Sequence, residues 1–271
     1  MRIEDFEDII YEKEENGICT VTISKPEIRN AITPITFLEI YTALEDMEKD
    51  KNSKVLIITG DPKGRAFTSG AYFRPEMLEK MKKHPEIDIK DIAQKKLCMK
   101  LWDFTKPVIA AINGMAIGGG ITMPLSGADL IYMSEDAWLG FYFVKRAIIP
   151  EFANCFILPF YLGFQKTKEI IYFGDKIFAK QAEELGLVNK VLPPDELIPY
   201  AREQALKLIP PKGPYMSIKL MKKTMHSYFR EILSNTLDLE NKALRKTFIS
   251  KDFNESMQAL KEKRDPEFIG K

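Results

Sequence analysis

The sequence is poor in the residues that most often build redox, metal and nucleophilic centres. It contains only 3 cysteines and 2 histidines in 271 residues. Cys19, Cys98 and Cys155 lack the spacing of metal ligands, and an odd, small number of thiols is typical of a reducing compartment. We therefore expect no metal site and interpret the three thiols as small core residues. The chain also lacks a G-x-S-x-G nucleophile elbow and a Gly-Lys-Ser/Thr phosphate loop.

An excess of charge of either sign is also missing. The chain carries 40 Lys and Arg against 39 Asp and Glu, a formal net charge of +1. Such a balance supplies no electrostatic field that would recruit nucleic acid or an anionic membrane. No apolar run approaches the roughly 20 residues that span a bilayer, and the acidic start of the chain is unlike a signal peptide. We expect a cytoplasmic protein without nucleic-acid or membrane partners.

What the sequence does contain is an alternation of apolar strands and amphipathic helices. Strands and helices alternate up to about residue 190 and helices dominate afterwards, which predicts an α/β fold. We expect an α/β core over residues 1–195 and a helical region over residues 196–271. Strands are predicted at 8–12, 18–24, 54–59, 65–69, 108–112, 128–133, 138–140 and near 187–191, and helices at 34–48, 75–83 and 89–104 and from Pro150 onward.

The segment 106–120, KPVIAAINGMAIGGG, is the most informative part of the chain. A buried strand over 108–112 is followed by a turn at Asn113-Gly114, and the three glycines open a helix. Glycines at a strand-to-helix junction let backbone N–H groups approach a bound group closely, and a helix N-terminus favours negative charge. The junction could hold a phosphate, stabilise an oxyanion, or simply form a tight turn.

Two further segments bear on the same chemistry. Phe67-Thr68-Ser69-Gly70-Ala71 ends a strand in small residues, which would expose the Ala71 N–H to a ligand. The N–H of Gly119 can point the same way, and two converging N–H groups form an oxyanion hole. Glu151 follows Pro150 at the predicted start of an apolar helix. A carboxylate there is either a capping charge or a general base with a raised pKa.

These segments together resemble the enoyl-CoA hydratase/isomerase (crotonase) superfamily. The motifs are FTSGA, KPVIAAINGMAIGGG, GADLIYMSEDAWLG, IIPEFAN and FGDKIFAKQAEELGLVNKV, and the match covers nearly the whole chain. The resemblance implies a crotonase-like spiral of ββα units with a C-terminal helical trimerisation region. It further implies an acyl-CoA thioester substrate, a homotrimer or a hexamer of two trimers, and no cofactor beyond the coenzyme A of the substrate.

The resemblance also assigns roles to residues. Ala71 and Gly119 match the two amides that hold the thioester oxygen. Hydratases of the family use two glutamates, and those positions hold Thr122 and Phe143 here, which disfavours hydration. Glu151 matches the glutamate of Δ3-Δ2-enoyl-CoA isomerases of the peroxisomal type. The chain is therefore predicted to move a double bond by a 1,3-proton shift, with Glu151 as the base.

By resemblance, coenzyme A contacts carry over to four further positions, in addition to Ala71, Tyr72 and Gly119. Arg29 and Ala31 match the loop that holds the nucleotide and pantetheine, Ala66 matches an adenine-pocket position, and Lys263 matches a lysine that reaches the CoA of a neighbouring subunit. Arg29 and Lys263 could equally be ordinary surface charges.

The acyl group is less well defined by the resemblance. Tyr72 stands where the family usually has Asp or Asn, so it would line the acyl pocket. Phe73, Trp138, Tyr142 and Phe143 could line the same pocket or lie in the core. Such a pocket would suit a bulky acyl group, with the segment 74–94 as a lid.

Two alternatives to the isomerase remain open. Glu151 could instead attack or hydrolyse a bulky acyl-CoA, as hydrolases, dehalogenases and hydratase variants of the superfamily do with other carboxylates. The chain could also be a homologue that binds CoA esters without catalysis, which the two absent glutamates favour and the two retained amide donors oppose.

Overall fold

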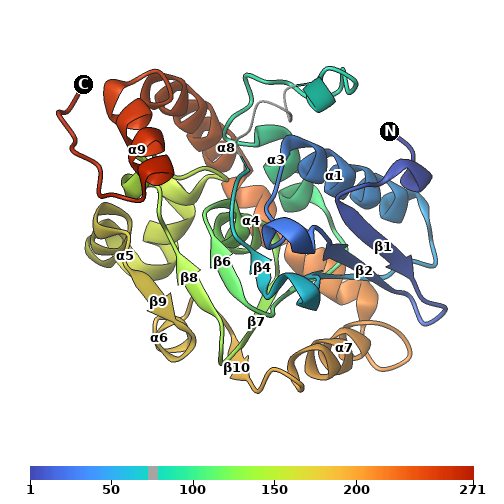
Figure 1. Cartoon of the computed structure of the whole chain (residues 1–271). Helices are drawn as coiled ribbons and strands as arrows, with labels where there is room; N and C mark the ends of the chain where they lie inside the picture. The colour runs from blue at the N-terminus through green and yellow to red at the C-terminus, as the bar shows by residue number, and fades with distance from the viewer. Residues whose placement is uncertain (73–78) are drawn as a thin grey trace.

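The computed structural model describes residues 1–72 and 79–271, and in this part the chain forms two mixed β-sheets surrounded by helices (Figure 1). The larger sheet has the strand order β1-β2-β3-β5-β7-β10 and the smaller one β4-β6-β8-β9. The predicted α/β class is thus confirmed. The strands are β1 Ile9–Lys13, β2 Ile18–Ile23, β3 Val55–Gly60, β4 Ala66–Thr68, β5 Val108–Ile112, β6 Met115–Ile117, β7 Leu130–Ser134, β8 Trp138–Gly140, β9 Lys176–Phe178 and β10 Lys190–Leu192.

Helices cover both faces of the larger sheet, because its strands carry apolar side chains on both faces. In β3, Leu56 and Ile58 pack in the cluster that contains α1, whereas Val55 and Ile57 pack in the cluster that contains α7. This alternation is the period of two expected of a strand buried on both faces. The helices are α1 Pro34–Lys49, α3 Lys95–Asp103, α4 Gly119–Gly127, α5 Asn154–Phe173, α6 Ala179–Glu184, α7 Leu197–Leu208, α8 Tyr215–Thr247 and α9 Lys251–Glu262.

The smaller sheet brings three chain segments to one edge. Strands β4, β6 and β8 are parallel neighbours, so their carboxyl ends point the same way. The segment 69–71 follows β4, Gly118-Gly119 follows β6, and the short helix η4 (Val144–Arg146) lies after β8. These three segments, far apart in the sequence, are therefore neighbours in space.

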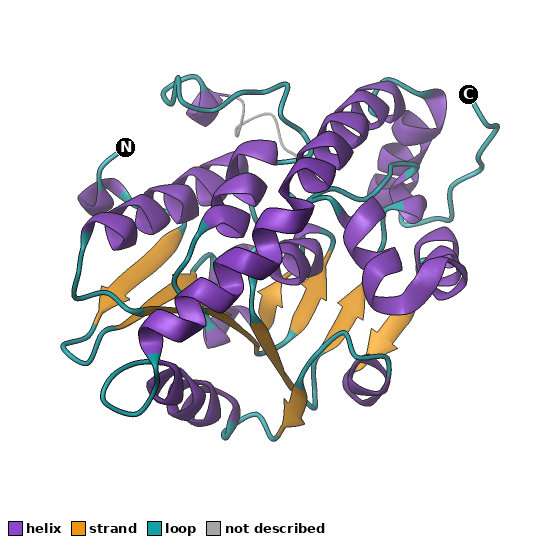
Figure 2. Ribbon diagram, turned by 180° about the vertical axis from the view of Figure 1, so that it is seen from behind, coloured by secondary structure: helices purple, strands orange, loops and turns teal. Residues whose placement is uncertain are grey.

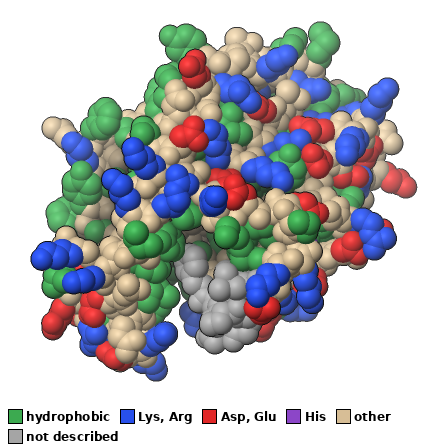
Figure 3. Space-filling model, turned by 90° about the horizontal axis from the view of Figure 1, so that it is seen from above, with side chains coloured by type: hydrophobic (Ala, Val, Ile, Leu, Met, Phe, Trp, Pro, Cys, Tyr) green, Lys and Arg blue, Asp and Glu red, His purple; other side chains and the backbone are tan. Residues whose placement is uncertain are grey.

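The C-terminal helices α8 and α9 lie against this edge. In Figure 2, the long helix α8 crosses diagonally in front of the strands, and it contacts both α3 and α5. α9 packs against η4. No helix in the described ranges is long and apolar enough to cross a bilayer. In the view of Figure 3, basic and acidic side chains are interspersed, consistent with the balanced composition.

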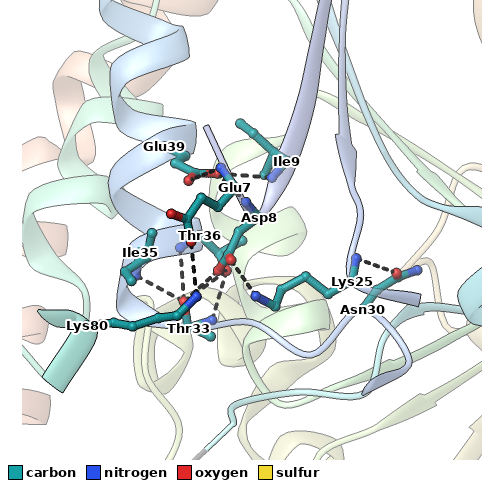
Figure 4. Close-up of polar contacts among 10 residues, drawn as sticks. All are labelled: Glu7, Asp8, Ile9, Lys25, Asn30, Thr33, Ile35, Thr36, Glu39 and Lys80. Carbon is teal, nitrogen blue, oxygen red and sulfur yellow. Dashed lines mark hydrogen bonds and ion pairs between the residues drawn. The ribbon is translucent and has the colours of Figure 1, made fainter. Parts of the chain in front are cut away.

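A buried acidic network ties the first strand to α1 (Figure 4). Asp8 accepts hydrogen bonds from Lys25 Nζ at 2.5 Å, Thr33 Oγ1 at 2.6 Å and Thr36 Oγ1 at 2.5 Å. Burial opposes the charged form of Asp8, but these hydrogen bonds outweigh it and lower its pKa. Nearby, Glu39 accepts the backbone N–H groups of residues 7–9. The network fixes Thr33, the N-cap of α1.

Removing the Asp8 carboxylate should destabilise the fold strongly. We expect Asp8→Ala to lower the free energy of unfolding by about 3–5 kcal/mol, because Lys25 and two hydroxyl groups lose their buried partner. Asp5→Ala is the matched control, since Asp5 pairs with Arg2 on the surface, and it should change stability by less than about 0.5 kcal/mol. Urea unfolding monitored by circular dichroism measures both variants, and equal effects would contradict the structural role of Asp8.

Several predicted elements differ in the structure. The helix predicted over 89–104 begins only at Lys95. The Asp91 side chain accepts the amides of Lys95 and Lys96, the first two residues of this helix, so Asp91 lies before the helix and not within it. The three-residue strands β6 and β9 were not predicted, since both are too short to show a period. The start of the predicted helix 75–83 lies outside the described residues.

The segment around Glu151 also differs from the prediction. α5 begins at Asn154, so Glu151 is not in the first turn of a helix. Phe152 and Ala153 both adopt a left-handed backbone conformation with φ of 57°, which interrupts the helix before Asn154. Cys19 and Cys98 are buried as predicted, but Cys155 is exposed, so its interpretation as a core residue is wrong.

Candidate functional site

A cavity of about 540 Å³ lies at the carboxyl ends of β4, β6 and β8. It brings together the three residues predicted to be catalytic, namely Ala71, Gly119 and Glu151. Its wall is mostly apolar and draws on segments from Ile32 to Leu260. The other described lining residues are Ile32, Thr33, Pro34, Phe37, Ser69, Gly70, Tyr72, Ile92, Gln94, Ile117, Gly118, Tyr142, Phe143, Arg146, Ile148, Leu244, Phe248, Phe253, Met257 and Leu260.

The amide of Ala71 is available to a ligand in this cavity. Ala71 lies opposite Ile32 in a parallel β-bridge, whose hydrogen bonds are made by the residues on either side of Ala71. The Ile32 N–H donates to Gly70 O, and the Ile32 carbonyl accepts from the Tyr72 N–H, both at 2.9 Å. The bridge leaves the Ala71 N–H without an acceptor among the described residues. Gly70 reaches this geometry with φ of +92°, a conformation that favours glycine.

The amide of Gly119 is available for a different reason. Gly119 is the first residue of α4, and the first N–H groups of a helix have no acceptor within the helix. No acceptor for it is found elsewhere in residues 1–72 or 79–271. A Cβ atom at this position would lie 2.8 Å from Ile32 Cδ1 and 3.3 Å from Glu151 Oε1. A glycine therefore lets the amide, the helix N-terminus and the carboxylate approach one another.

Glu151 supplies the carboxylate of the cavity. Its Oε1 accepts a hydrogen bond from Thr122 Oγ1 at 3.0 Å. Burial raises the pKa of Glu151 to about 8; the Thr122 hydrogen bond lowers it and the nearby charge of Glu240 raises it. Of the described residues that line the cavity, Glu151 alone has an acidic side chain. A carboxyl group titrating near neutral pH can both accept and return a proton.

Glu240 on α8 was not identified from the sequence, and it holds the segment that follows Glu151. Its carboxylate accepts the N–H of Ala153 at 2.7 Å and the N–H of Cys155 at 2.9 Å, at the N-terminus of α5. Glu240 is buried, which raises its pKa to about 7. The sequence indicates only that Glu240 lies in a helix. Its contact with the segment after Glu151 could not be predicted, because the tertiary fold alone brings these two parts of the chain together.

We expect Glu240→Gln to lower the free energy of unfolding by about 1–3 kcal/mol, because one of the two amides would face an NH₂ donor. Loss of the Glu240 charge should also lower the pKa of Glu151. Urea unfolding and the titration of Glu151 followed by carbon NMR measure the two effects. An unchanged stability and titration would show that Glu240 does not position this segment.

The two positions at which hydratases carry glutamates are occupied by other groups. Thr122 is buried in α4 and donates to Glu151, as described. Phe143 is also buried and lines the cavity, with its ring near Gly118. No group of three His, Cys, Asp or Glu side chains in the described chain could hold a metal ion.

Of the residues predicted to contact coenzyme A, Ala71, Tyr72 and Gly119 line the cavity, whereas Arg29, Ala31, Ala66 and Lys263 do not. Ala31 and Ala66 are buried, and the Asn30 side chain donates to Ala66 O at 2.7 Å. Arg29 is exposed and its carbonyl accepts from Ser69 N at 3.1 Å, so this loop is attached beside the end of β4. Lys263 is exposed and ends α9, the helix that contributes Phe253, Met257 and Leu260 to the cavity.

The predicted acyl-pocket residues divide into three groups. Tyr72, Tyr142 and Phe143 line the cavity, and Trp138 is not among its described lining residues. Phe73 and residues 74–78 of the predicted lid lie outside the described residues. Ile92 and Gln94, at the end of that segment, line the cavity. The contributions of α8 and α9 to the cavity were not predicted, because their apolar residues carry no motif.

The arrangement of the two sheets and C-terminal helices is the crotonase fold. The structure superimposes on the crystal structure of an enoyl-CoA hydratase/isomerase from Pseudoalteromonas atlantica T6c with a TM-score of 0.83, covering 97% of this chain and 100% of the other. At 24% identity this likeness shows the fold alone. The predicted crotonase-like spiral is confirmed.

The chain belongs to the Enoyl-CoA hydratase/isomerase family, which matches residues 13–271. It is 31% identical to a crotonyl-CoA hydratase of Syntrophomonas wolfei, over 98% of this chain and 99% of that protein. It is 28% identical to the 1,2-epoxyphenylacetyl-CoA isomerase of Escherichia coli, over 97% of this chain and 99% of that protein. Its relatives thus include both hydratases and isomerases that act on acyl-CoA thioesters.

Proposed function

We propose that this protein is a Δ3-Δ2-enoyl-CoA isomerase that uses Glu151 as its base. The observation that carries the proposal is the combination, in a single cavity, of one carboxylate of raised pKa with two amides that have no acceptor among the described residues. A 1,3-proton shift requires one group that accepts and returns a proton and one site that stabilises an enolate. Both requirements match the groups that line this cavity.

The reaction would proceed in two proton transfers. The Ala71 and Gly119 amides bind the thioester oxygen, and ionised Glu151 removes a proton from C2 of a 3-enoyl-CoA. The electron pair of the broken C–H bond moves into a dienolate, whose negative charge is held by the two amides and the N-terminus of α4. The protonated Glu151 then returns the proton to C4, which leaves the 2-enoyl-CoA and regenerates the carboxylate. Thr122 orients the carboxylate through its hydrogen bond.

The proposal extends to the binding of coenzyme A and to assembly. Arg29, Ala31 and Ala66 would contact the nucleotide and pantetheine beside β4, and Lys263 would reach the coenzyme A of a neighbouring subunit. The α/β core would comprise residues 1–195 and the oligomerisation region residues 196–271, in a homotrimer or a hexamer. Exposed apolar side chains on α5 and α8, such as Phe160, Phe164 and Tyr228, support burial between subunits. The compartment is proposed to be the cytoplasm.

Product analysis with three thioesters distinguishes the candidate functions. Wild-type protein is incubated with a 3-enoyl-CoA, a 2-enoyl-CoA and a 4-halobenzoyl-CoA, and products are followed by absorbance and mass. We expect double-bond migration from the 3-enoyl-CoA without a gain in mass. Addition of water to the 2-enoyl-CoA would favour a hydratase, and release of halide or free acid would favour a dehalogenase or hydrolase. Binding of all three without turnover would favour a non-catalytic homologue.

The pH dependence of isomerisation should follow the titration of Glu151. The base is active only when ionised, and its pKa is raised to about 8. We therefore expect kcat/KM to fall about tenfold for each pH unit below 8 and to level off above it. Steady-state rates between pH 6 and 9.5 measure the profile. A profile that is flat across this range would contradict a role for Glu151 as the base.

A further inference from the structure

Arg146 places a positive charge in the otherwise largely apolar wall of the cavity. It lies in η4, between Phe143 and Ile148, which also line the cavity. Its backbone is fixed because its N–H donates to Phe143 O at 2.9 Å and its carbonyl accepts from Ser256 Oγ on α9 at 3.3 Å. The resemblance to the family assigned no role to this residue.

The guanidinium of Arg146 has few partners in the described structure. Its Nη1 donates to Lys145 O at 3.1 Å, and no acidic side chain of residues 1–72 or 79–271 forms an ion pair with it. Burial lowers the pKa of Arg146, and no described carboxylate offsets this effect. Arg146 is half-buried, and a guanidinium has five N–H donors, of which the described protein engages few. An anionic ligand would satisfy donors that the described protein leaves without acceptors.

The position of Arg146 indicates which part of a ligand it would meet. The order of the small sheet is β4-β6-β8. The loop that contains Arg29 is attached at the end of β4, the Gly119 amide follows β6, and Arg146 follows β8. A thioester held between Ala71 and Gly119, with its coenzyme A toward the Arg29 loop, would therefore extend its acyl chain toward Arg146.

We propose that the substrate is a dicarboxylic acid monothioester of coenzyme A, whose distal carboxylate binds Arg146. The inference rests on the proposed function, since that function places the thioester at Ala71 and Gly119. A carboxylate matches the planar fork of a guanidinium through two parallel hydrogen bonds. Apolar side chains that line the same cavity, including Ile117 and Ile148, would contact the methylene groups of the chain.

Binding of unreactive saturated thioesters tests this proposal without catalysis. Dissociation constants are measured by calorimetry for adipoyl-, suberoyl- and sebacoyl-CoA and for hexanoyl-, octanoyl- and decanoyl-CoA. We expect at least one diacid thioester to bind roughly 10- to 100-fold more tightly than the monoacid of the same length. Arg146→Leu should remove this preference, whereas Lys145→Leu, which removes a neighbouring exposed charge, should retain it.

The outcomes separate this inference from the isomerase itself. No preference for a diacid at any length, or an equal loss of affinity for free coenzyme A in Arg146→Leu, would overturn it; the second result would assign Arg146 to a phosphate of coenzyme A. Rates with a 3-enedioyl-CoA and a 3-enoyl-CoA are then compared. A diacid preference in binding without double-bond migration would refute the isomerase and leave the role of Arg146 standing.

Discussion

Replacing Glu151 by glutamine should reduce isomerisation of a 3-enoyl-CoA by roughly 10²–10⁴-fold, the usual contribution of a positioned acid or base. Glutamine has nearly the same shape, and its carbonyl oxygen can still accept the hydrogen bond from Thr122. It cannot accept a proton from C2. The loss should therefore appear in kcat, while the dissociation constant of a saturated acyl-CoA changes little.

Stability measurements control for unfolding of the Glu151→Gln variant. The folded state raises the pKa of Glu151 from 4.5 to about 8, so the folded protein holds this proton more tightly than the unfolded chain does. The contribution of Glu151 to stability is complete below pH 4.5 and is lost as the pH rises through 8. The variant should thus be more stable than wild type at pH 9, by on the order of 5 kcal/mol. An inactive variant that is less stable at this pH, or an active variant, would contradict the assignment.

Loss of the Gly119 N–H should have the second largest effect. Gly119→Pro removes the amide hydrogen at the first position of α4, where proline is well tolerated. Removing one donor of an oxyanion hole costs about 3–4 kcal/mol of transition-state stabilisation, or roughly 10²–10³-fold in kcat. The added atoms would also contact Ile32 Cδ1 and Glu151 Oε1, so a steric control is needed.

Gly119→Ala provides that control. It introduces a Cβ at the same place, 2.8 Å from Ile32 Cδ1, but keeps the N–H. Since Cδ1 is the end of a flexible side chain, we expect the alanine variant to lose much less activity than the proline variant. Comparing kcat for the two isolates the hydrogen bond, and equal losses would show that space, rather than the donor, matters at this position.

The sequence predicted most of the larger sheet and three groups that line the cavity, Ala71, Gly119 and Glu151. Strands such as Val108–Ile112 were found at their observed bounds because they are continuous apolar runs between turn residues. Ala71 and Gly119 were singled out because small residues at the ends of strands leave backbone N–H groups exposed to a ligand. Glu151 was noted from its position alone, but one carboxylate beside apolar residues equally suits a cap, and only the family resemblance favoured the role of a base.

Other parts of the site could not be predicted because they depend on contacts distant in the sequence. The predicted helical start at Glu151 failed because Phe152 and Ala153 take left-handed conformations, while Glu240, more than eighty residues later, accepts the amides that follow. Arg146 was missed because a single arginine in a short segment carries no periodic signal, and its place in the cavity depends on α9.

A crystal structure with a bound 3-enoyl-CoA analogue tests most directly whether Glu151 is the proton-transferring group. A saturated or 3-thia acyl-CoA would serve as the unreactive ligand. We expect the thioester oxygen to accept hydrogen bonds from Ala71 and Gly119, and a Glu151 oxygen to lie about 3–3.5 Å from both C2 and C4. A Glu151 carboxylate turned away from the thioester, or another acidic side chain closer to these carbons, would contradict the account.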